Sequence, residues 1–370
     1  MSDMRLWYDH QIFVFQRYGG VSRYFVELAS RIHQYPGTKV HIVAPLYMSK
    51  LLAAQSNALP VLGLPFTYDI RGAGAIMRKL DPSIIRLLSG LYRPDIVHET
   101  YYSRERTSNS SAKTVITVYD MIEELFPDNF PMNKKTIDIR KAAFRRADHL
   151  ICISESTRAD LIRLYGVNAD KVSVVYLASS LVAPLHPDVE VKEPFFLYVG
   201  GRAGYKNFLA LLDAFAESML FKSHKLVCFG GGRLTEHEQK RMKQLRIPND
   251  RIVYVGGDDA ALSRYYASAE AFVYPSLYEG FGIPLLEAMG CGCPVICSNS
   301  SSIPEVAGDA AIYFDPRDFQ SISNAMLKVV QSSNERRQMI SKGKDRVQRF
   351  SWDICAQQTY AVYARILNRQ

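Results

Sequence analysis

The sequence from Tyr274 to Pro316 reads YPSLYEGFGIPLLEAMGCGCPVICSNSSSIPEVAGDAAIYFDP. It continues an apolar run, turns at glycines, and enters a segment of helical spacing whose proline suits a first helical position. This order of strand, loop and helix places Glu279 in the loop and Glu287 about one turn inside the helix. Because a helix N-terminus carries unpaired N–H groups and a partial positive charge, backbone donors from Gly282 to Leu285 are expected to hold a phosphate. The two carboxylates can accept hydrogen bonds from sugar hydroxyls, so the stretch predicts an anion and polyol site.

A second candidate site follows the apolar run FFLYVG, in the turn from Gly200 to Lys206. Arg202 and Lys206 are four residues apart, so both side chains can converge on one diphosphate, the Arg with a two-pronged fork and the Lys with a compact charge. Taken alone, two cations in a loop are more often surface charges. The strand end at Val255 is expected to present backbone groups to a nucleotide base, and Gly230 to Gly232 either join the site or only turn the chain.

The first half of the chain carries a similar unit. A strand-like run from Met4 to Tyr8 precedes Gly19 and Gly20, which open a helix with regular apolar spacing. Glycines at a helix start let the backbone approach a phosphate or sugar phosphate closely, although these two do not complete the G-x-G-x-x-G fingerprint.

Three polar side chains stand where further strands of this half are expected to end: His98, Tyr119 and Asp120. Short apolar strands that alternate with helices predict a mostly parallel sheet, which binds ligands outside the carboxyl ends of its strands. Their position therefore marks these three residues as ligand candidates.

Length and composition set the class of protein. A chain of 370 residues with 48% hydrophobic residues suits two packed domains. The net charge of +8 favours an anionic partner, but no run of five Lys or Arg and no RNA-binding signature occurs, so we expect no nucleic acid. Neither a signal peptide nor a long apolar span is present, which predicts a cytoplasmic protein. The six cysteines lie mostly in apolar runs and are expected to be reduced core residues, not zinc ligands.

A basic segment from Lys134 to Ala147 has two readings. It is either a solvated helix face or a contact with anionic lipid or a phosphate-bearing acceptor, where each nearby cation contributes on the order of 1 kcal/mol. Possible peripheral membrane association follows from the second reading.

The domain boundaries follow from a change in pattern. The segment between Ala178 and Pro194 is rich in proline and lacks a sustained period, as a linker does. We therefore expect one domain over residues 1–180 and another over residues 194–350, with a final helix over 352–369.

Several motifs together resemble the donor-site signature of family 4 of the retaining nucleotide-sugar glycosyltransferases. They are Tyr278-Glu279-Gly280-Phe281-Gly282, Glu287-Ala288-Met289 and Ser302-Ile303-Pro304-Glu305-Val306, together with Ile-Ser-Glu-Ser-Thr ending at Thr157. The resemblance spans nearly the whole chain and implies an α/β protein with two doubly wound, Rossmann-like domains facing a cleft, the arrangement called GT-B. It also implies that the final helix packs back on the first domain.

The same resemblance implies roles for the candidate residues. Glu279 would contact the donor sugar, Glu287 the ribose hydroxyls, and Arg202 and Lys206 the departing diphosphate. The residues expected to bind the donor are Gly19, Gly20, Arg202, Lys206, Val255, Glu279, Gly282, Ile283, Pro284, Leu285 and Glu287. We expect a metal-independent, retaining transfer without a cofactor, because no Asp-x-Asp pair for a divalent ion occurs.

The chain departs from the family at Tyr119, where much of the family has a His that touches the donor sugar. A phenol can donate a hydrogen bond, but with a reference pKa near 10 it is a poor general base at neutral pH. Asp120 is a candidate for orienting an acceptor hydroxyl. His98 is either a capping or core residue or an acceptor-site residue.

We therefore expect a hexosyltransferase, with mannose mildly preferred, that moves sugar from a GDP, UDP or ADP donor to a saccharide or lipid-linked acceptor in surface polysaccharide or lipopolysaccharide assembly. Two alternatives remain at the level of sequence. One is a sugar-nucleotide 2-epimerase of similar architecture, which needs no acceptor. The other is a catalytically silent protein that only binds nucleotide sugars.

Overall fold

The structure, a computed structural model, describes residues 3–66, 73–108, 111–130, 133–202 and 204–368. The chain divides into two compact units. Unit 1 comprises residues 1–124, 132–177 and 352–370, and unit 2 comprises residues 125–131 and 178–351. The division after residue 177 lies close to the boundary expected at 180, and the whole proline-rich segment belongs to unit 2. The short excursion at 125–131 was not expected from the sequence.

Unit 1 is built on a seven-stranded sheet in the order β3-β2-β1-β4-β5-β6-β7, with every neighbouring pair parallel. Its strands β4 and β6 are buried throughout, as expected for a parallel sheet covered on both faces. The strands are β1 (Met4–Tyr8), β2 (Thr38–Tyr47), β3 (Val61–Pro65), β4 (Ile96–Glu99), β5 (Lys113–Val118), β6 (His149–Cys152) and β7 (Val172–Val174). The helices are α1 (Gln11–Phe15), α2 (Gly20–Ile32), α3 (Lys50–Gln55), α4 (Ala73–Tyr92), α5 (Ile122–Leu125), α6 (Asn133–Arg146), α7 (Glu155–Tyr165) and α15 (Trp352–Asn368).

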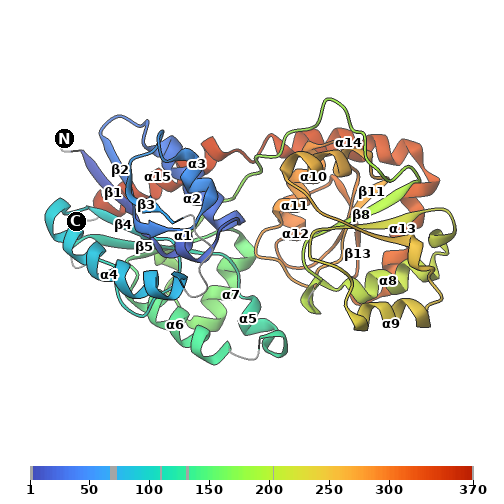
Figure 1. Cartoon of the computed structure of the whole chain (residues 1–370), viewed down its shortest axis with the longest axis horizontal. Helices are drawn as coiled ribbons and strands as arrows, with labels where there is room; N and C mark the ends of the chain where they lie inside the picture. Colours follow the sequence, from blue (N-terminus) through green and yellow to red (C-terminus); the bar gives the residue numbers. More distant parts are fainter. Residues whose placement is uncertain (1–2, 67–72, 109–110, 131–132, 203, 369–370) are drawn as a thin grey trace. The chain divides into compact units, whose positions relative to one another are not determined.

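The last helix, α15, lies in unit 1 against α2, as Figure 1 shows in red beside blue. Asp353 forms an ion pair of 2.7 Å with Arg31 of α2, and the rings of Tyr360 and Tyr35 meet edge to face with centroids 5.2 Å apart. Because Cys355 and Tyr363 on its inner face have no exposed surface, this helix completes the core of unit 1.

Unit 2 is built on a six-stranded parallel sheet in the order β10-β9-β8-β11-β12-β13. The strands are β8 (Phe195–Val199), β9 (Lys225–Phe229), β10 (Ile252–Val255), β11 (Ala271–Tyr274), β12 (Val295–Ser298) and β13 (Ala311–Phe314). The helices are α8 (Phe208–Glu217), α9 (Glu236–Gln244), α10 (Asp259–Ser268), α11 (Ile283–Gly290), α12 (Ile303–Ala307), α13 (Phe319–Gln331) and α14 (Ser333–Val347).

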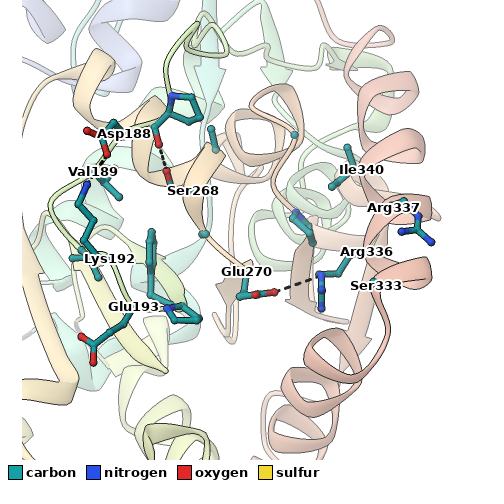
Figure 2. Close-up of a pocket in the computed structure, with 18 residues that line it drawn as sticks. Asp188, Val189, Lys192, Glu193, Ser268, Glu270, Ser333, Arg336, Arg337 and Ile340 are labelled. Atoms are coloured by element: carbon teal, nitrogen blue, oxygen red, sulfur yellow. Dashed lines mark hydrogen bonds and ion pairs between the residues drawn. The ribbon is translucent and has the colours of Figure 1, made fainter. Parts of the chain in front are cut away.

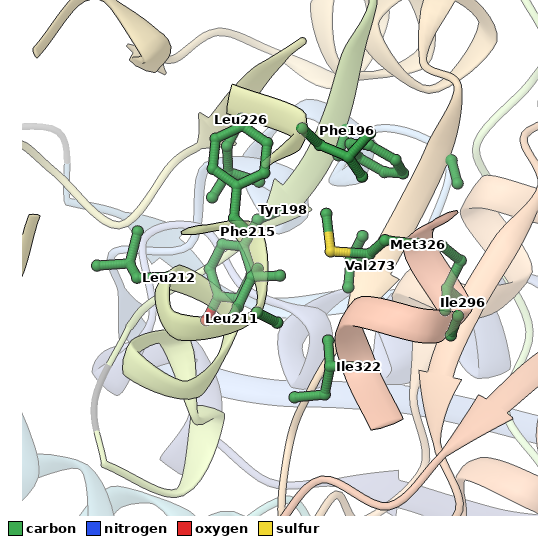
Figure 3. Packing of buried hydrophobic residues seen from close by; sticks show 14 of the residues in the cluster. Phe196, Tyr198, Leu211, Leu212, Phe215, Leu226, Val273, Ile296, Ile322 and Met326 are labelled. Atoms are coloured by element: carbon green, nitrogen blue, oxygen red, sulfur yellow. The ribbon is translucent and has the colours of Figure 1, made fainter. Parts of the chain in front are cut away.

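The core of unit 2 joins one face of this sheet to α8 and α13. Figure 3 shows Phe196, Val273 and Ile296 of the strands meeting Phe215 of α8 and Met326 of α13. Side chains of this size stabilise a fold by about 1.5 to 3 kcal/mol each when fully buried. The core therefore fixes the strands whose carboxyl ends carry the candidate residues.

Both sheets share one topological feature that positions ligands. In each, the chain starts at an inner strand, builds one side of the sheet and then crosses to the other, so that β1 lies beside β4 and β8 beside β11. Ligands of doubly wound sheets bind outside the carboxyl ends of the strands at such a switch point. The two doubly wound α/β sheets predicted from the sequence are confirmed. None of the helices in the described ranges combines the length and apolar character that crossing a bilayer requires.

Candidate functional site

The switch point of unit 2 holds the residues that the sequence singled out. The loop after β8 carries Arg202 and Lys206, and the loop after β11 carries Glu279 and Gly282. The two loops are joined by a backbone hydrogen bond from Leu277 N–H to the Tyr205 carbonyl at 2.8 Å. Ala203, in the middle of the first loop, lies outside the described residues.

Lys206 and Glu279 form an ion pair. The Lys206 ammonium lies 2.7 Å and 3.0 Å from the two oxygens of the Glu279 carboxylate. The side chains are 23% and 9% exposed, so the pair is partly desolvated but reachable from solvent. The ammonium also lies 5.3 Å and 5.8 Å from the ring centres of Tyr205 and Tyr274. Because the Lys206 ammonium is reachable from solvent, an anion that enters the site can replace Glu279 as its partner.

Two serines fix the loop that carries Glu279. The Glu279 N–H donates to Ser301 Oγ at 2.9 Å, and the buried Ser302 hydroxyl lies 2.9 Å from the carbonyls of both Glu279 and Phe281. Ser301 has a φ of 51°, in the left-handed region that few non-glycine residues adopt. Ser301 and Ser302 were not among the site residues predicted from the sequence. The signal that could have indicated them is the close spacing of hydroxyl residues before a helix start.

Arg202 does not share the surroundings of Lys206. Its Nε lies 2.9 Å from Glu238 Oε1, and its Nη2 lies 2.8 Å from each of the carbonyls of Gly232 and Arg233. The Arg202 and Glu238 side chains are only 3% and 6% exposed. In this structure the guanidinium therefore holds the glycine loop, and the expected convergence of both cations on one diphosphate is not the geometry found. The alternative, that Arg202 is an ordinary surface charge, is also wrong, because its side chain is buried.

The glycine loop after β9 is shaped around this guanidinium. Gly230, Gly231 and Gly232 have φ values of 76°, 70° and 77°, all in the left-handed region. Three successive left-handed residues turn carbonyls toward Arg202, which L-residues with a Cβ do at a cost. The loop therefore does more than turn the chain. The Val255 carbonyl accepts from Gly230 N–H at 2.9 Å, so Val255 anchors this loop besides any role toward a base.

The N-terminus of α11 offers fewer donors than expected. Gly282 caps the helix with a φ of 110°, and proline lies in the first turn as predicted. However, Pro284 has no N–H, and the Leu285 N–H already donates to the Gly282 carbonyl at 3.0 Å. The amides of Gly282 and Ile283 are therefore the donors nearest the helix start. The prediction that the backbone from Gly282 to Leu285 offers four free donors is therefore wrong at Pro284 and Leu285.

Glu287 lies one turn into α11, as predicted, and its side chain is half-buried. The Tyr266 hydroxyl of α10 donates to its Oε2 at 3.2 Å. Burial and the nearby Glu287 carboxylate raise the pKa of Tyr266 well above its usual range, so the phenol stays a donor. This contact holds the carboxylate in place.

Two phenylalanines of the excursion at 125–131 also reach this part of unit 2. Phe126 lies 5.9 Å from Tyr205 and 6.3 Å from Tyr278 between ring centres, and Phe130 lies 6.3 Å from Tyr205. They flank the loops of Lys206 and Glu279 with aromatic surface. Nothing in the local sequence spacing predicts this, because the contact joins residues far apart in the chain.

A cavity of about 640 Å³ lies at the opposite end of the strands of the same sheet. Figure 2 shows Asp188, Lys192 and Glu193 of the proline-rich segment on one side and Arg336 of α14, paired with Glu270, on the other. Because Glu270 directly precedes β11, this cavity lies at the amino ends of the strands. It is separate from the candidate residues.

In unit 1, Gly19 and Gly20 lie exposed at the start of α2, as expected. Gly19 has extended backbone, and a Cβ there would lie 2.2 Å from the Gln16 side-chain oxygen. That oxygen accepts from the Ser22 N–H at 3.3 Å. A side chain at position 19 would therefore displace the Gln16 side chain from the start of α2.

Tyr119 is turned into unit 1. Its side chain is buried, and its hydroxyl donates to the Thr100 carbonyl at 2.8 Å. Burial and the neighbouring Tyr102 raise its pKa well above its usual range. The Tyr119 hydroxyl therefore already donates its proton to a group of the protein, which does not support a role as a hydrogen-bond donor to a sugar hydroxyl.

Asp120 lies at the same strand end and is partly exposed. Its Oδ1 accepts from the Ile122 N–H at 3.0 Å and lies 3.7 Å from Arg140 Nη1. Arg140, only 3% exposed, also contacts Glu124 at 3.1 Å. The basic helix is thus not one solvated face: Arg140 is internal, and Arg146 pairs with the buried Glu99. Lys134, Lys135, Lys141 and Arg145 are the exposed cations of this segment.

His98 is a core residue, the first of its two expected roles. It has no exposed surface, and its ring nitrogens lie 2.6 Å from Tyr363 Oη and 2.8 Å from Thr117 Oγ1. A side chain enclosed in this way does not reach an acceptor, so the acceptor-site role is corrected. Burial lowers its pKa from 6.5 to about 3.

This burial predicts a pH dependence of stability. Unfolded His98 takes up a proton near its ordinary pKa of 6.5, whereas the folded imidazole stays neutral down to about pH 3. Unfolding therefore binds a proton in that window, and the free energy of unfolding should fall with falling pH by up to about 1.4 kcal/mol per pH unit from this residue. Urea titrations between pH 4 and pH 7 should show a shallower slope for His98→Gln. His186→Gln, on the exposed linker, is the control, and equal slopes in all three proteins would contradict the assignment.

No group of three or more His, Cys, Asp or Glu suited to a metal ion occurs among the residues with described positions. Metal independence stays a prediction. The six cysteines are free and buried, as expected.

Comparisons with known proteins agree with this architecture. Residues 186–346 match the model described as "Glycosyl transferases group 1", and residues 18–178 match "Glycosyltransferase Family 4". The O-antigen chain mannosyltransferase B of Escherichia coli is 34% identical over 229 residues, which cover 58% of this chain and 60% of that protein. The chain spans less than two thirds of the length of the first curated relatives that it matches.

Solved structures are similar over nearly the whole chain. A sucrose-phosphate synthase from Thermosynechococcus elongatus superposes with a TM-score of 0.77 at 20% identity, covering 99% of this chain and 100% of that one. Anabaena HepE in complex with UDP and glucose gives a TM-score of 0.74 at 17% identity, covering 98% and 99%. At these identities the likeness concerns the fold.

Proposed function

Because the chain belongs to the group 1 and family 4 glycosyltransferases, with one family model matching each half, we propose that it is a hexosyltransferase that uses a nucleoside diphosphate sugar. The proposed acceptor is a hydroxyl of a saccharide or of a lipid-linked saccharide in surface polysaccharide assembly. Mannose is the proposed sugar, and the name of the Escherichia coli relative supports it. The proposed reaction retains configuration and uses no metal.

The observation that carries the proposal is the Lys206–Glu279 pair at the switch point of unit 2. Breaking the anomeric bond of the donor leaves negative charge on the diphosphate, so the transition state needs fixed positive groups beside it. In the proposed mechanism the Lys206 ammonium exchanges Glu279 for phosphate oxygens. The freed Glu279 carboxylate then accepts hydrogen bonds from the donor sugar. The Gly282 and Ile283 amides complete the anion site.

Arg202 has an indirect part in this mechanism. Its guanidinium holds the glycine loop beside the site through the carbonyls of Gly232 and Arg233. A direct contact between Arg202 and the diphosphate would require that the diphosphate replace Glu238. The acceptor hydroxyl attacks from the side of the leaving group and gives its proton to the departing phosphate. That route assigns no side chain as a nucleophile.

The nucleotide base of the donor, and whether the protein transfers, epimerises or only binds its sugar, can be tested directly. Thermal unfolding should be followed with UDP, GDP, ADP, CDP and dTDP in parallel, because a ligand at a hundred times its Kd stabilises the folded state by about 2.7 kcal/mol. The stabilising nucleotide's mannose conjugate is then incubated with and without saccharide acceptors, and products are identified by mass and anomeric configuration. A disaccharide of retained configuration is expected. Sugar release or epimerisation without acceptor, or binding without turnover, would overturn the transferase assignment.

Replacing Glu287 by Ala should weaken nucleotide binding more than turnover at saturating donor. A carboxylate that accepts hydrogen bonds from the ribose hydroxyls is worth about 1.5 to 3 kcal/mol, so Kd should rise by roughly 10- to 150-fold. Titration calorimetry with the nucleotide found above measures this. Glu217→Ala, at an exposed position of α8, is the matched control. An unchanged Kd in Glu287→Ala would remove this residue from the site.

A further inference from the structure

The loop that carries Glu279 depends on other segments for its position. Residues 275–282 lie between β11 and α11, outside every helix and strand of the structure. Glu279 is only 7% exposed, and a backbone N–H shielded from water needs a hydrogen-bond partner. Because no helix or strand supplies that partner, side chains from elsewhere in unit 2 must do so.

Left-handed backbone marks two residues that have this role. Among the described residues, five that are not glycine have a positive φ: Arg93, Asn207, Met219, Arg246 and Ser301. Three of them follow the ends of α4, α8 and α9 by one or two residues, where left-handed backbone is common. Asn207 and Ser301, with φ values of 58° and 51°, do not follow an α-helix. Their conformation needs another reason.

Both of these residues hold the loop of Glu279 through their side chains. Asn207 Nδ2 donates to the Pro275 carbonyl at 3.1 Å, and Ser301 Oγ accepts from the Glu279 N–H at 2.9 Å. Left-handed backbone is common for asparagine but unfavourable for serine. Strained backbone persists where the surrounding structure enforces it, and it concentrates at functional sites. The hydrogen bond to Glu279 gives the strain at Ser301 a function.

A glycine at position 301 would relieve this strain but could not make the contact. Glycine adopts positive φ about as readily as negative φ, but it has no hydroxyl to accept from Glu279. Ser302 holds the other side of the same residue, because its fully buried hydroxyl lies 2.9 Å from the Glu279 carbonyl. With its N–H and its carbonyl both held, Glu279 has a fixed Cα–Cβ direction.

That direction determines where the carboxylate of Glu279 lies. The carboxylate is 2.7 Å from the Lys206 ammonium, and in the proposed mechanism it turns from this cation to the donor sugar. A fixed backbone lets the carboxylate change partner without a rearrangement of the loop. Groups that act on a substrate work best when supporting hydrogen bonds hold them in the productive geometry.

We propose that Ser301 is a positioning residue for sugar transfer, whose left-handed backbone aims its hydroxyl at the Glu279 N–H and so sets the carboxylate that meets the donor sugar. This inference rests on the proposed transferase function. It also assigns a cost, because the serine that supports turnover is less favourable for folding than a glycine at the same position.

The test uses three variants of the full chain. Ser301→Gly and Ser301→Ala both remove the hydroxyl, and each should lower kcat by roughly 5- to 30-fold, less than the 10²-fold that a misplacement of about 1 Å can cost. Ser301→Thr keeps the hydroxyl on a β-branched residue that disfavours left-handed backbone, so it should keep more of the rate than Ser301→Gly. Ser300→Ala is the control, since no hydrogen bond joins Ser300 Oγ to the Glu279 loop among the described residues.

Stability separates positioning from a merely structural role. The urea midpoint should be higher in Ser301→Gly than in Ser301→Ala, because only glycine relieves the strain, although both lose rate. The Kd for nucleoside diphosphate should change by less than about twofold in both, since Glu279 is assigned to the sugar and not to the nucleotide.

The outcomes distinguish this inference from the proposed function. Initial rates are measured with the nucleotide sugar and acceptor that give product with the wild-type protein. A lower kcat in Ser301→Gly at an equal or higher urea midpoint supports the positioning role. Wild-type kcat in Ser301→Gly, or a rate that follows the urea midpoint across all variants, overturns it and leaves the transferase assignment intact. A wild-type protein that binds nucleotide but transfers sugar to no acceptor would overturn the proposed function and, with it, this role of Ser301.

Discussion

Replacing Lys206 by Ala should lower kcat by about 10²- to 10³-fold, the typical effect of removing one preorganised group that stabilises developing negative charge. In the proposed reaction that charge appears on the departing diphosphate, and Lys206 is the cation at the switch point that is partly exposed and bound by a single carboxylate. Initial rates at saturating donor and acceptor measure the effect. Lys206→Arg should keep part of the activity, because it keeps the charge but changes its geometry.

A design with a second variant separates catalysis from folding. Lys206→Ala alone leaves the Glu279 carboxylate, 9% exposed, without its cation, and an uncompensated charge at such a site destabilises a protein. The double variant Lys206→Ala/Glu279→Gln restores neutrality and should recover most of the lost free energy of unfolding, but not the rate. Lys222→Ala, exposed after α8, is the matched single control. Wild-type rates in a folded Lys206→Ala protein would sink the assignment.

The sequence predicts the two sheets well because local pattern determines them. Apolar runs of four to six residues that alternate with helical segments are sufficient to predict parallel strands, and the loops after β8 and β11 were located from their glycines and prolines. The position of Pro284 at the start of α11 is likewise local. Such features depend on residues next to each other in the chain.

Side-chain partners are less predictable because they join distant residues. Lys206 and Glu279 are 73 positions apart, and Arg202 and Glu238 are 36 apart. Spacing of four residues suggested that Arg202 and Lys206 share a ligand, but α9 supplies a carboxylate that binds Arg202 instead. His98 meets Tyr363 across 265 positions, so its burial depends on the return of the last helix to unit 1.

The same distinction explains why a pocket of about 210 Å³ in unit 1, lined by His10, Phe15 and Arg86 among others, was not predicted. Its three walls come from loops and a helix that are ordinary in local sequence, and only the sheet order brings them together. Asp9 and Thr100 have no motif around them, yet 91 positions apart they form the contact that fixes the pocket. Tertiary contacts of this kind require the fold before the chemistry can be assigned.

Replacing Gly231 by Ala should destabilise unit 2 and weaken donor binding together. Gly231 has a φ of 70°, and an added Cβ would lie 2.4 Å from the Gly200 carbonyl oxygen and 3.1 Å from Arg202 Nη1. Left-handed backbone costs a residue with a Cβ about 1 to 2 kcal/mol, and forcing an extra methyl into packed surroundings adds about 1 to 3 kcal/mol. The free energy of unfolding, measured by urea titration, should therefore fall by roughly 2 to 5 kcal/mol.

Gly232→Ala is the control that isolates the backbone cost. Gly232 has a φ of 77°, but an added Cβ there meets nothing within 4 Å, so its loss should be only about 1 to 2 kcal/mol. The additional loss of free energy of unfolding in Gly231→Ala comes from the contact of the new Cβ with the loop after β8. Because that loop carries both Arg202 and Lys206, the excess should appear again as a higher Kd for nucleoside diphosphate in Gly231→Ala than in Gly232→Ala. Equal stability and equal Kd in the two variants would show that Arg202 and the glycine loop do not shape the donor site.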